Sequence, residues 1–145
     1  MWVGMYRENH EKFCCCSIIP VIYLVLRNVN EDPIAKDFLI TNIRLGNTIL
    51  YSFVTRLELL LYYDLTHREA QQIDFLLQQF NRVEYNARIE EIILSIGKNK
   101  KVKIPDAIIA ASAIYSNSIL VTRNTKDFIN IPNLNMLNPF EEMTT

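Results

Sequence analysis

The chain has 145 residues and a formal net charge of −1, and half of its residues are hydrophobic. This length and composition are typical of one domain with a hydrophobic core and exclude an intrinsically disordered chain. Only three glycines occur, so the chain contains neither a G-x-G-x-x-G loop nor a Walker A loop. The near-zero net charge also excludes a global basic field, so any nucleic-acid-binding surface must be local.

The three cysteines are consecutive, at residues 14–16, and the chain has no others. Long-range disulfides are therefore excluded, which favours a reducing compartment such as the cytoplasm. The spacing does not match a C-x2-C zinc motif, and the two histidines supply no H-x3-5-H partner. The apolar stretch at residues 13–26 contains Pro20 and is too short to span a bilayer, so no membrane segment is expected.

The start of the chain shows no hydrophobic periodicity. We interpret residues 1–16 as an N-terminal appendage of uncertain structure, residues 17–140 as the folded domain and residues 141–145 as a tail. The β-branched run at residues 18–26 predicts a first strand that is buried on both faces, although Pro20 is unusual in a central strand.

The remaining pattern alternates between helical and extended segments. Helices are predicted at residues 32–45, 54–63, 66–80, 86–96, 106–117 and 124–130, and further strands at residues 48–53, 82–86, 118–122 and 134–137. Thr66 and Glu69 form a capping box, Gly97 is predicted to stop a helix, and Pro105 opens another. This order predicts an α/β fold with a parallel β-sheet between α-helices, whose functional groups gather at the carboxyl ends of the strands.

Glu58 is the sharpest candidate for a chemical role. It lies among leucines, one turn after a predicted strand. Burying such a carboxylate costs free energy unless it meets a cation or a metal ion. Exposure on a helix stripe, or pairing with Arg56 or Arg123, would also account for it. Thr55, on the same helical face, is placed to hydrogen-bond the carboxylate.

Three further polar residues fall at predicted junctions between strands and helices. Asp106 opens the apolar helix, and Asn124 and Asp127 follow the fourth strand, where helix capping alone would account for them. Together with Glu58 they converge on one sheet edge, where carboxylates repel one another unless a hard cation such as Mg2+ or Mn2+ lies between them. Such a site hydrolyses phosphodiesters by activating water.

A basic run, KNKKVK at residues 98–103, leads directly into this helix start. We predict that Lys100 and Lys101, with Arg123, contact nucleic-acid phosphates beside the metal site, which makes binding depend on salt. A solvated loop with no binding role is the alternative.

Several of these segments resemble a PIN-domain protein of the VapC toxin type. They are FVTRLELL at residues 53–60, IPDAIIAA at 104–111, LVTRNTKDF at 120–128 and LNPF at 137–140. The resemblance covers about residues 17–140 and implies a parallel sheet sandwiched between helices. It also implies a Mg2+-dependent endoribonuclease that cleaves RNA, a cognate antitoxin that holds it inactive, and a homodimer.

The resemblance also assigns roles to single residues. Glu58 and Asp106 match the second and third acids, Asn124 the fourth position, and Asp127 an additional acid. All four are then catalytic residues, and the three carboxylates among them are the metal ligands.

The family's opening motif, Asp-(Ser/Thr)-Asn, is missing. With Tyr23 aligned on the family's tyrosine, Ser17 takes the place of the first acid. Because serine lacks the charge of a carboxylate, weak or lost catalysis is expected, and the alternative function is an inactive PIN fold that binds antitoxin or RNA. A response-regulator-like or small-molecule α/β domain is disfavoured, because the chain has no glycine-rich loop and no acid pair after its first strand.

Overall fold

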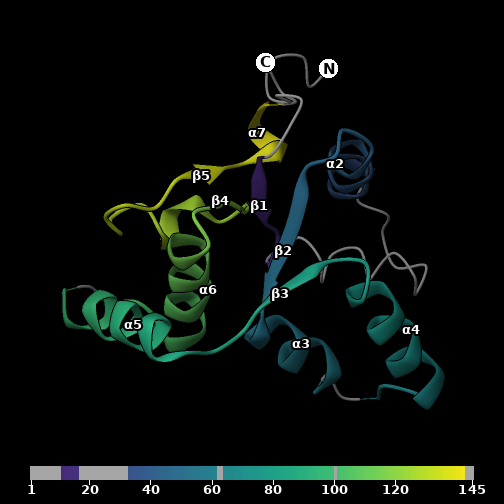
Figure 1. The fold of residues 1–145 in the computed structure, drawn as a ribbon, viewed down its shortest axis with the longest axis horizontal. Helices are drawn as coiled ribbons and strands as arrows, with labels where there is room; N and C mark the ends of the chain where they lie inside the picture. The colour runs from purple at the N-terminus through teal and green to yellow at the C-terminus, as the bar shows by residue number, and fades with distance from the viewer. Residues whose placement is uncertain (1–10, 17–32, 62–63, 100, 143–145) are drawn as a thin grey trace.

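The computed structural model describes residues 11–16, 33–61, 64–99 and 101–142. Five strands in these ranges form one sheet in the order β3-β2-β1-β4-β5, and all pairings are parallel (Figure 1). The strands are β1 (Lys12–Cys14), β2 (Thr48–Ser52), β3 (Asn81–Val83), β4 (Ile119–Val121) and β5 (Met136–Leu137). The predicted α/β fold with a parallel sheet is therefore confirmed.

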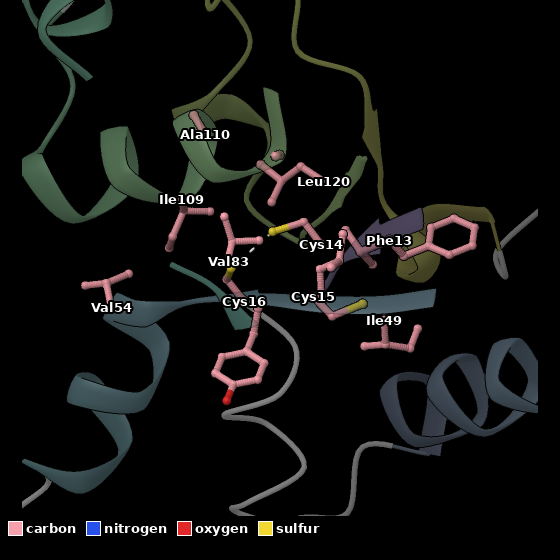
Figure 2. Close-up of a cluster of buried hydrophobic side chains, with 14 of the residues drawn as sticks. Phe13, Cys14, Cys15, Cys16, Ile49, Val54, Val83, Ile109, Ala110 and Leu120 are labelled. Carbon is pink, nitrogen blue, oxygen red and sulfur yellow. Dashed lines mark hydrogen bonds between the residues drawn. The ribbon is translucent and has the colours of Figure 1, made fainter. Parts of the chain in front are cut away.

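Helices cover the sheet on both sides. They are α2 (Pro33–Arg44), α3 (Phe53–Leu60), α4 (His67–Leu77), α5 (Ala87–Asn99), α6 (Ile104–Tyr115) and α7 (Pro139–Glu142), with a 3-10 turn η1 at Thr125–Asp127. Figure 2 shows α6 and α2 on opposite sides of the β1–β2 pair. Within the described ranges, no helix is long and apolar enough to cross a membrane.

Local signals fix most helix ends. The Thr66 side chain accepts the Glu69 backbone N–H, and the Glu69 carboxylate accepts the Thr66 backbone N–H, which confirms the capping box. Gly46 adopts a φ of 79° after α2, a conformation that glycine reaches without strain. The predicted stop at Gly97 is wrong, because α5 continues to Asn99. A glycine inside a helix costs only about 1 kcal/mol relative to alanine, too little to end this one.

The position of β1 corrects the predicted domain boundary. This strand lies between β2 and β4 at the centre of the sheet, so residues 12–16 belong to the fold and not to an appendage. Phe13 packs edge-on against Phe38 of α2, with ring centroids 5.3 Å apart. The three cysteines are buried as small apolar side chains, so the centre of the sheet needs no β-branched run here.

Two other predicted boundaries have different outcomes. The predicted strand at residues 18–26 lies outside the described residues. The helix α7 extends to Glu142, so it crosses the predicted start of the tail at residue 141.

Candidate functional site

The elements that carry the predicted site residues meet at the carboxyl edge of the sheet. α3 begins directly after β2, and η1 follows β4. α6 ends shortly before β4 begins, so its first turn lies at the same edge as the ends of the strands. Glu58, Asp106 and Asp127 therefore reach this edge from three separate elements.

These three carboxylates, which we call the acidic cluster, influence one another electrostatically. Partial desolvation raises the pKa of Glu58, and the charge of Asp106 raises it further. Desolvation also raises the pKa of Asp106, the charge of Asp127 adds to that effect, and the charge of Lys103 opposes it. Asp106 is thus the central member of the acidic cluster, and its neighbours make its charged form less favourable.

A cavity of about 360 Å³ lies beside the acidic cluster. Asp106 and Asp127 line it together with Lys101, Lys103 and Lys126. A larger cavity of about 660 Å³ lies between α5 and residues 129–133, and none of the acidic cluster lines it. The smaller cavity is therefore the one that combines carboxylates with cations.

The sequence predicted only part of this lysine set. Lys101 lines the cavity as predicted, while Lys100 lies outside the described residues. Lys103 and Lys126 are not among the predicted phosphate contacts, although Lys103 belongs to the basic run. Lys126 lies two residues after Asn124 and carried no signal in the sequence.

Two predicted residues take other positions. The Arg123 guanidinium stacks over the Phe140 ring at 3.8 Å from its centroid, and Arg123 does not line the cavity. The Asn124 carbonyl accepts the Asp127 backbone N–H at 3.2 Å, but the Asn124 side chain makes no capping hydrogen bond. Asn124 therefore shapes the turn through its backbone.

The alternatives for Glu58 are also resolved in part. Arg56 pairs with Asp74 of α4 at 3.1 Å rather than with Glu58. The Thr55 hydroxyl is buried and has no hydrogen-bond partner among the described residues, so its predicted hydrogen bond to Glu58 is wrong. Glu58 is exposed on α3, as the stripe alternative expects, and partial desolvation of its carboxylate raises its pKa.

The carboxyl end of the central strand carries a thiol. Cys16 is the second residue after β1 and is 1% exposed, and its sulfur accepts the Ser52 backbone N–H at 3.1 Å. Ser17, the position aligned with the first acid, lies outside the described residues. β1 and the two described residues after it have the sequence Lys-Phe-Cys-Cys-Cys. This described segment therefore contributes no carboxylate to the acidic cluster.

The comparisons with known proteins agree with this architecture. The model of the PIN domain family matches residues 21–134 of the chain. The chain belongs to the PIN-domain family. A search of curated proteins gave no significant match.

Solved structures give the same answer for the fold of this PIN domain. A VapBC2 complex from Rickettsia felis bound to promoter DNA is 20% identical with a TM-score of 0.68, covering 88% of this chain and 98% of that chain. A toxin–antitoxin complex from Klebsiella pneumoniae is 27% identical with a TM-score of 0.66, covering 89% and 97%. VapBC-1 from nontypeable Haemophilus influenzae is 21% identical with a TM-score of 0.66, covering 89% and 98%.

PIN domains generally depend on a divalent metal ion, and the residues present fit one only in part. The oxygen donors of the acidic cluster suit a hard cation, which would offset the desolvation and the repulsion from Asp127 that raise the pKa of Asp106. The Cys16 sulfur is a poor ligand for such an ion. Among the described residues, no three His, Cys, Asp or Glu side chains come close enough together to hold a metal ion.

Proposed function

We propose that this PIN protein is an endoribonuclease toxin of a toxin–antitoxin pair, which hydrolyses RNA phosphodiesters with Mg2+ or Mn2+. The observation that carries the proposal is the acidic cluster beside a lysine-lined cavity, with Asp106 belonging to both. Carboxylates bind the metal ion and lysines bind the phosphates, which are the two requirements of this reaction. The toxin–antitoxin complexes among the solved neighbours support the biological context.

Each member of the site has a separate task in this proposal. Glu58, Asp106 and Asp127 hold the ion, which when bound lowers the pKa of water and neutralises charge on the phosphate. Asp127 and Asn124, which share a tight turn, orient the attacking water or a second ion. Lys101 attracts the RNA backbone from the cavity wall, and Lys100 and Arg123 are the other phosphate contacts that we propose from the sequence.

An RNA-cleavage assay tests the proposal. We expect cleavage in Mg2+ that EDTA abolishes. Glu58→Gln and Asp106→Asn should each lower the rate by more than about 100-fold, since even the outer partners of metal ligands contribute about 10- to 100-fold. Glu91→Gln is the matched control, because this exposed α5 carboxylate pairs with Arg88 and lies outside the acidic cluster. Full activity in both acid variants would overturn the assignment.

A second function is favoured by one observation, the Cys16 thiol at the end of β1. If no carboxylate completes the metal site, the chain is an inactive PIN fold that binds antitoxin or RNA. This alternative predicts RNA binding in EDTA and no cleavage at any Mg2+ concentration. The cleavage assay in Mg2+ separates the two functions, because both allow RNA binding in EDTA and only the nuclease cleaves.

The proposed partners are a cognate antitoxin and a second copy of the chain. The antitoxin is supported by the VapBC complexes among the structural neighbours. Light scattering tests the homodimer, which should have twice the 17.0 kDa of one chain. The three free cysteines agree with a reducing compartment such as the cytoplasm.

A further inference from the structure

The larger of the two cavities has no role in the proposed nuclease chemistry. Its volume is about 660 Å³, and it lies between α5 and residues 129–133. Cavities of about 300–1,000 Å³ are typical of ligand sites. None of the acidic cluster lines this one, so it does not hold the metal ion of the proposed reaction.

The larger cavity adjoins the lysine-lined one. Asn130 and Ile131 line both cavities. Lys126 and Asp127 line the smaller cavity and come only a few residues earlier on the same segment. The two cavities therefore follow one another along residues 126–133, and a chain-like ligand that binds beside the acidic cluster can continue into the larger cavity.

The two cavities differ in charge. Three lysines and two carboxylates line the smaller one, which suits phosphates and a cation. The charged residues that line the larger one are Arg88 and Glu91, and they pair with each other at 3.2 Å on the exposed surface of α5. Because this pair adds no net charge, the larger cavity suits an uncharged group, and neither partner of the pair is assigned a contact with that group.

The remaining walls combine apolar surface with amide groups. The side chains of Asn130 and Asn133 are exposed, so their amides are open to a ligand and offer both donors and acceptors. A nucleobase has the matching chemistry, because its flat faces pack against side chains and its edge carries hydrogen-bonding groups. The apolar lining residues are Ile92, Ile96, Ile114, Ile129, Ile131 and Pro132.

We propose that the larger cavity binds one nucleobase of the RNA strand, next to the phosphate that lies at the acidic cluster. This inference rests on the proposed nuclease function and adds a second subsite to it. The isoleucines contact the face of the base, and the amide of Asn133 hydrogen-bonds its edge. Only an unpaired base fits this role, because the bases of a duplex are already stacked and paired.

Fluorescence anisotropy in EDTA tests the subsite with two labelled single-stranded RNAs of equal length, one with bases and one abasic throughout. Ile129→Ala and Asn133→Gly should each weaken binding of the RNA with bases by about 5-fold, the effect of one hydrogen bond or about one buried CH2 group. Neither variant should change binding of the abasic RNA, which carries the same phosphates. Ile129 is 67% exposed and Asn133 has a φ of 65°, which glycine adopts without strain, so both variants should fold.

The matched control is Leu94→Ala on α5. Leu94 is 56% exposed and lines neither cavity, so this variant should bind both RNAs as wild type does. The dependence of binding on salt gives a second readout. Ile129→Ala and Asn133→Gly should keep the wild-type slope of log Kd against log salt, because they remove no phosphate contact.

Two outcomes would overturn the subsite. One is unchanged affinity of both cavity variants for the RNA with bases, and the other is an equal loss of affinity for the two RNAs. Either result can occur while the wild-type protein cleaves RNA in Mg2+, which would leave the nuclease assignment standing. Conversely, a base-dependent loss in EDTA from a protein that never cleaves RNA would support the subsite and overturn the nuclease assignment alone.

Discussion

Partial desolvation and, beyond it, the Asp106 carboxylate raise the pKa of Glu58, although Asp106 and Glu58 lie on different helices, α6 and α3. The pKa of Asp106 is in turn raised by desolvation and by the charge of Asp127. Without a bound cation, the folded protein therefore holds like charges together at the edge of its sheet. An arrangement that opposes its own ionisation is typical of a functional site rather than of a surface selected for stability.

This repulsion predicts a pH-dependent stability. An acid whose pKa is raised by folding stabilises the native state fully below its unfolded pKa, and this contribution is lost as the pH rises through the folded pKa. Glu58→Gln and Asp106→Asn mimic the protonated acids, so both variants should melt at higher temperature than wild type at pH 7 without metal. The difference should vanish below about pH 4, where carboxyl groups are protonated. Thermal scans at both pH values measure it, and lower melting temperatures for both variants at pH 7 would contradict it.

The thiol at the end of β1 predicts a gain of function. Cys16→Asp places a carboxylate beside Ser52 and Thr55. Mg2+ should therefore raise the melting temperature of this variant more than that of wild type, because an ion that binds the folded state more tightly stabilises it more. Melting temperatures across a Mg2+ titration measure the effect. Cys15→Asp is the matched control, because its carboxylate faces α2 and gains no Mg2+ response.

Ser17→Asp should be tested in the same titration, since Ser17 is the position aligned with the first acid. A larger Mg2+ response for Ser17→Asp than for Cys16→Asp would assign the position to Ser17. An unchanged Mg2+ response in both variants would show that neither residue borders the metal site.

Most elements were predictable because their signals are local. The Thr66 capping box and the Asn86 side chain, which accepts the Ile89 N–H at 3.0 Å, act within one helical turn. The position of β1 was not predictable in this way, because its burial comes from pairing with β2 and β4. The central strand of the described sheet contains Phe13 and the small, buried Cys14, which give no β-branched signal, and the predicted strand at residues 18–26 lies outside the described residues.

Part of the candidate site was also predictable from the sequence, and part was not. Glu58, Asp106 and Asp127 were predictable because the order of parallel strands places their elements at one edge. The role of Lys126 in the cavity wall, and the stacking of Arg123 on Phe140, depend on side-chain directions that no local pattern specifies.

The central position of β1 predicts a large stability effect at Phe13. Phe13→Ala should destabilise the protein by about 3–5 kcal/mol, because it removes a buried ring that packs against Phe38. Ile43→Ala on α2 is the control, and its 49% exposure predicts a change of about 0.5 kcal/mol or less. Denaturant unfolding measures both. If Phe13→Ala destabilised the protein as little as Ile43→Ala, residues 12–16 would not belong to the folded core and the predicted appendage would stand.

The lysine-lined cavity predicts how RNA binding depends on salt. Lys103→Gln and Lys126→Gln should each weaken binding and lower the slope of log Kd against log salt by about 0.7, the value for one phosphate contact on a single strand. Lys36→Gln is the control, because Lys36 is exposed on α2 and does not line the cavity. Fluorescence anisotropy in EDTA measures binding without cleavage.

The two lysines differ in their influence on the acidic cluster, and binding in EDTA measures their phosphate contacts without cleavage. Lys103 lowers the pKa of Asp106, so Lys103→Gln disturbs the acidic cluster as well as the phosphate contact. Lys126 is not among the charges that shift the pKa of Asp106, so Lys126→Gln should change the salt slope mainly through the lost phosphate contact. Equal salt slopes for wild type and both cavity variants would remove these lysines from the RNA-binding surface, because a released counterion must appear in the slope.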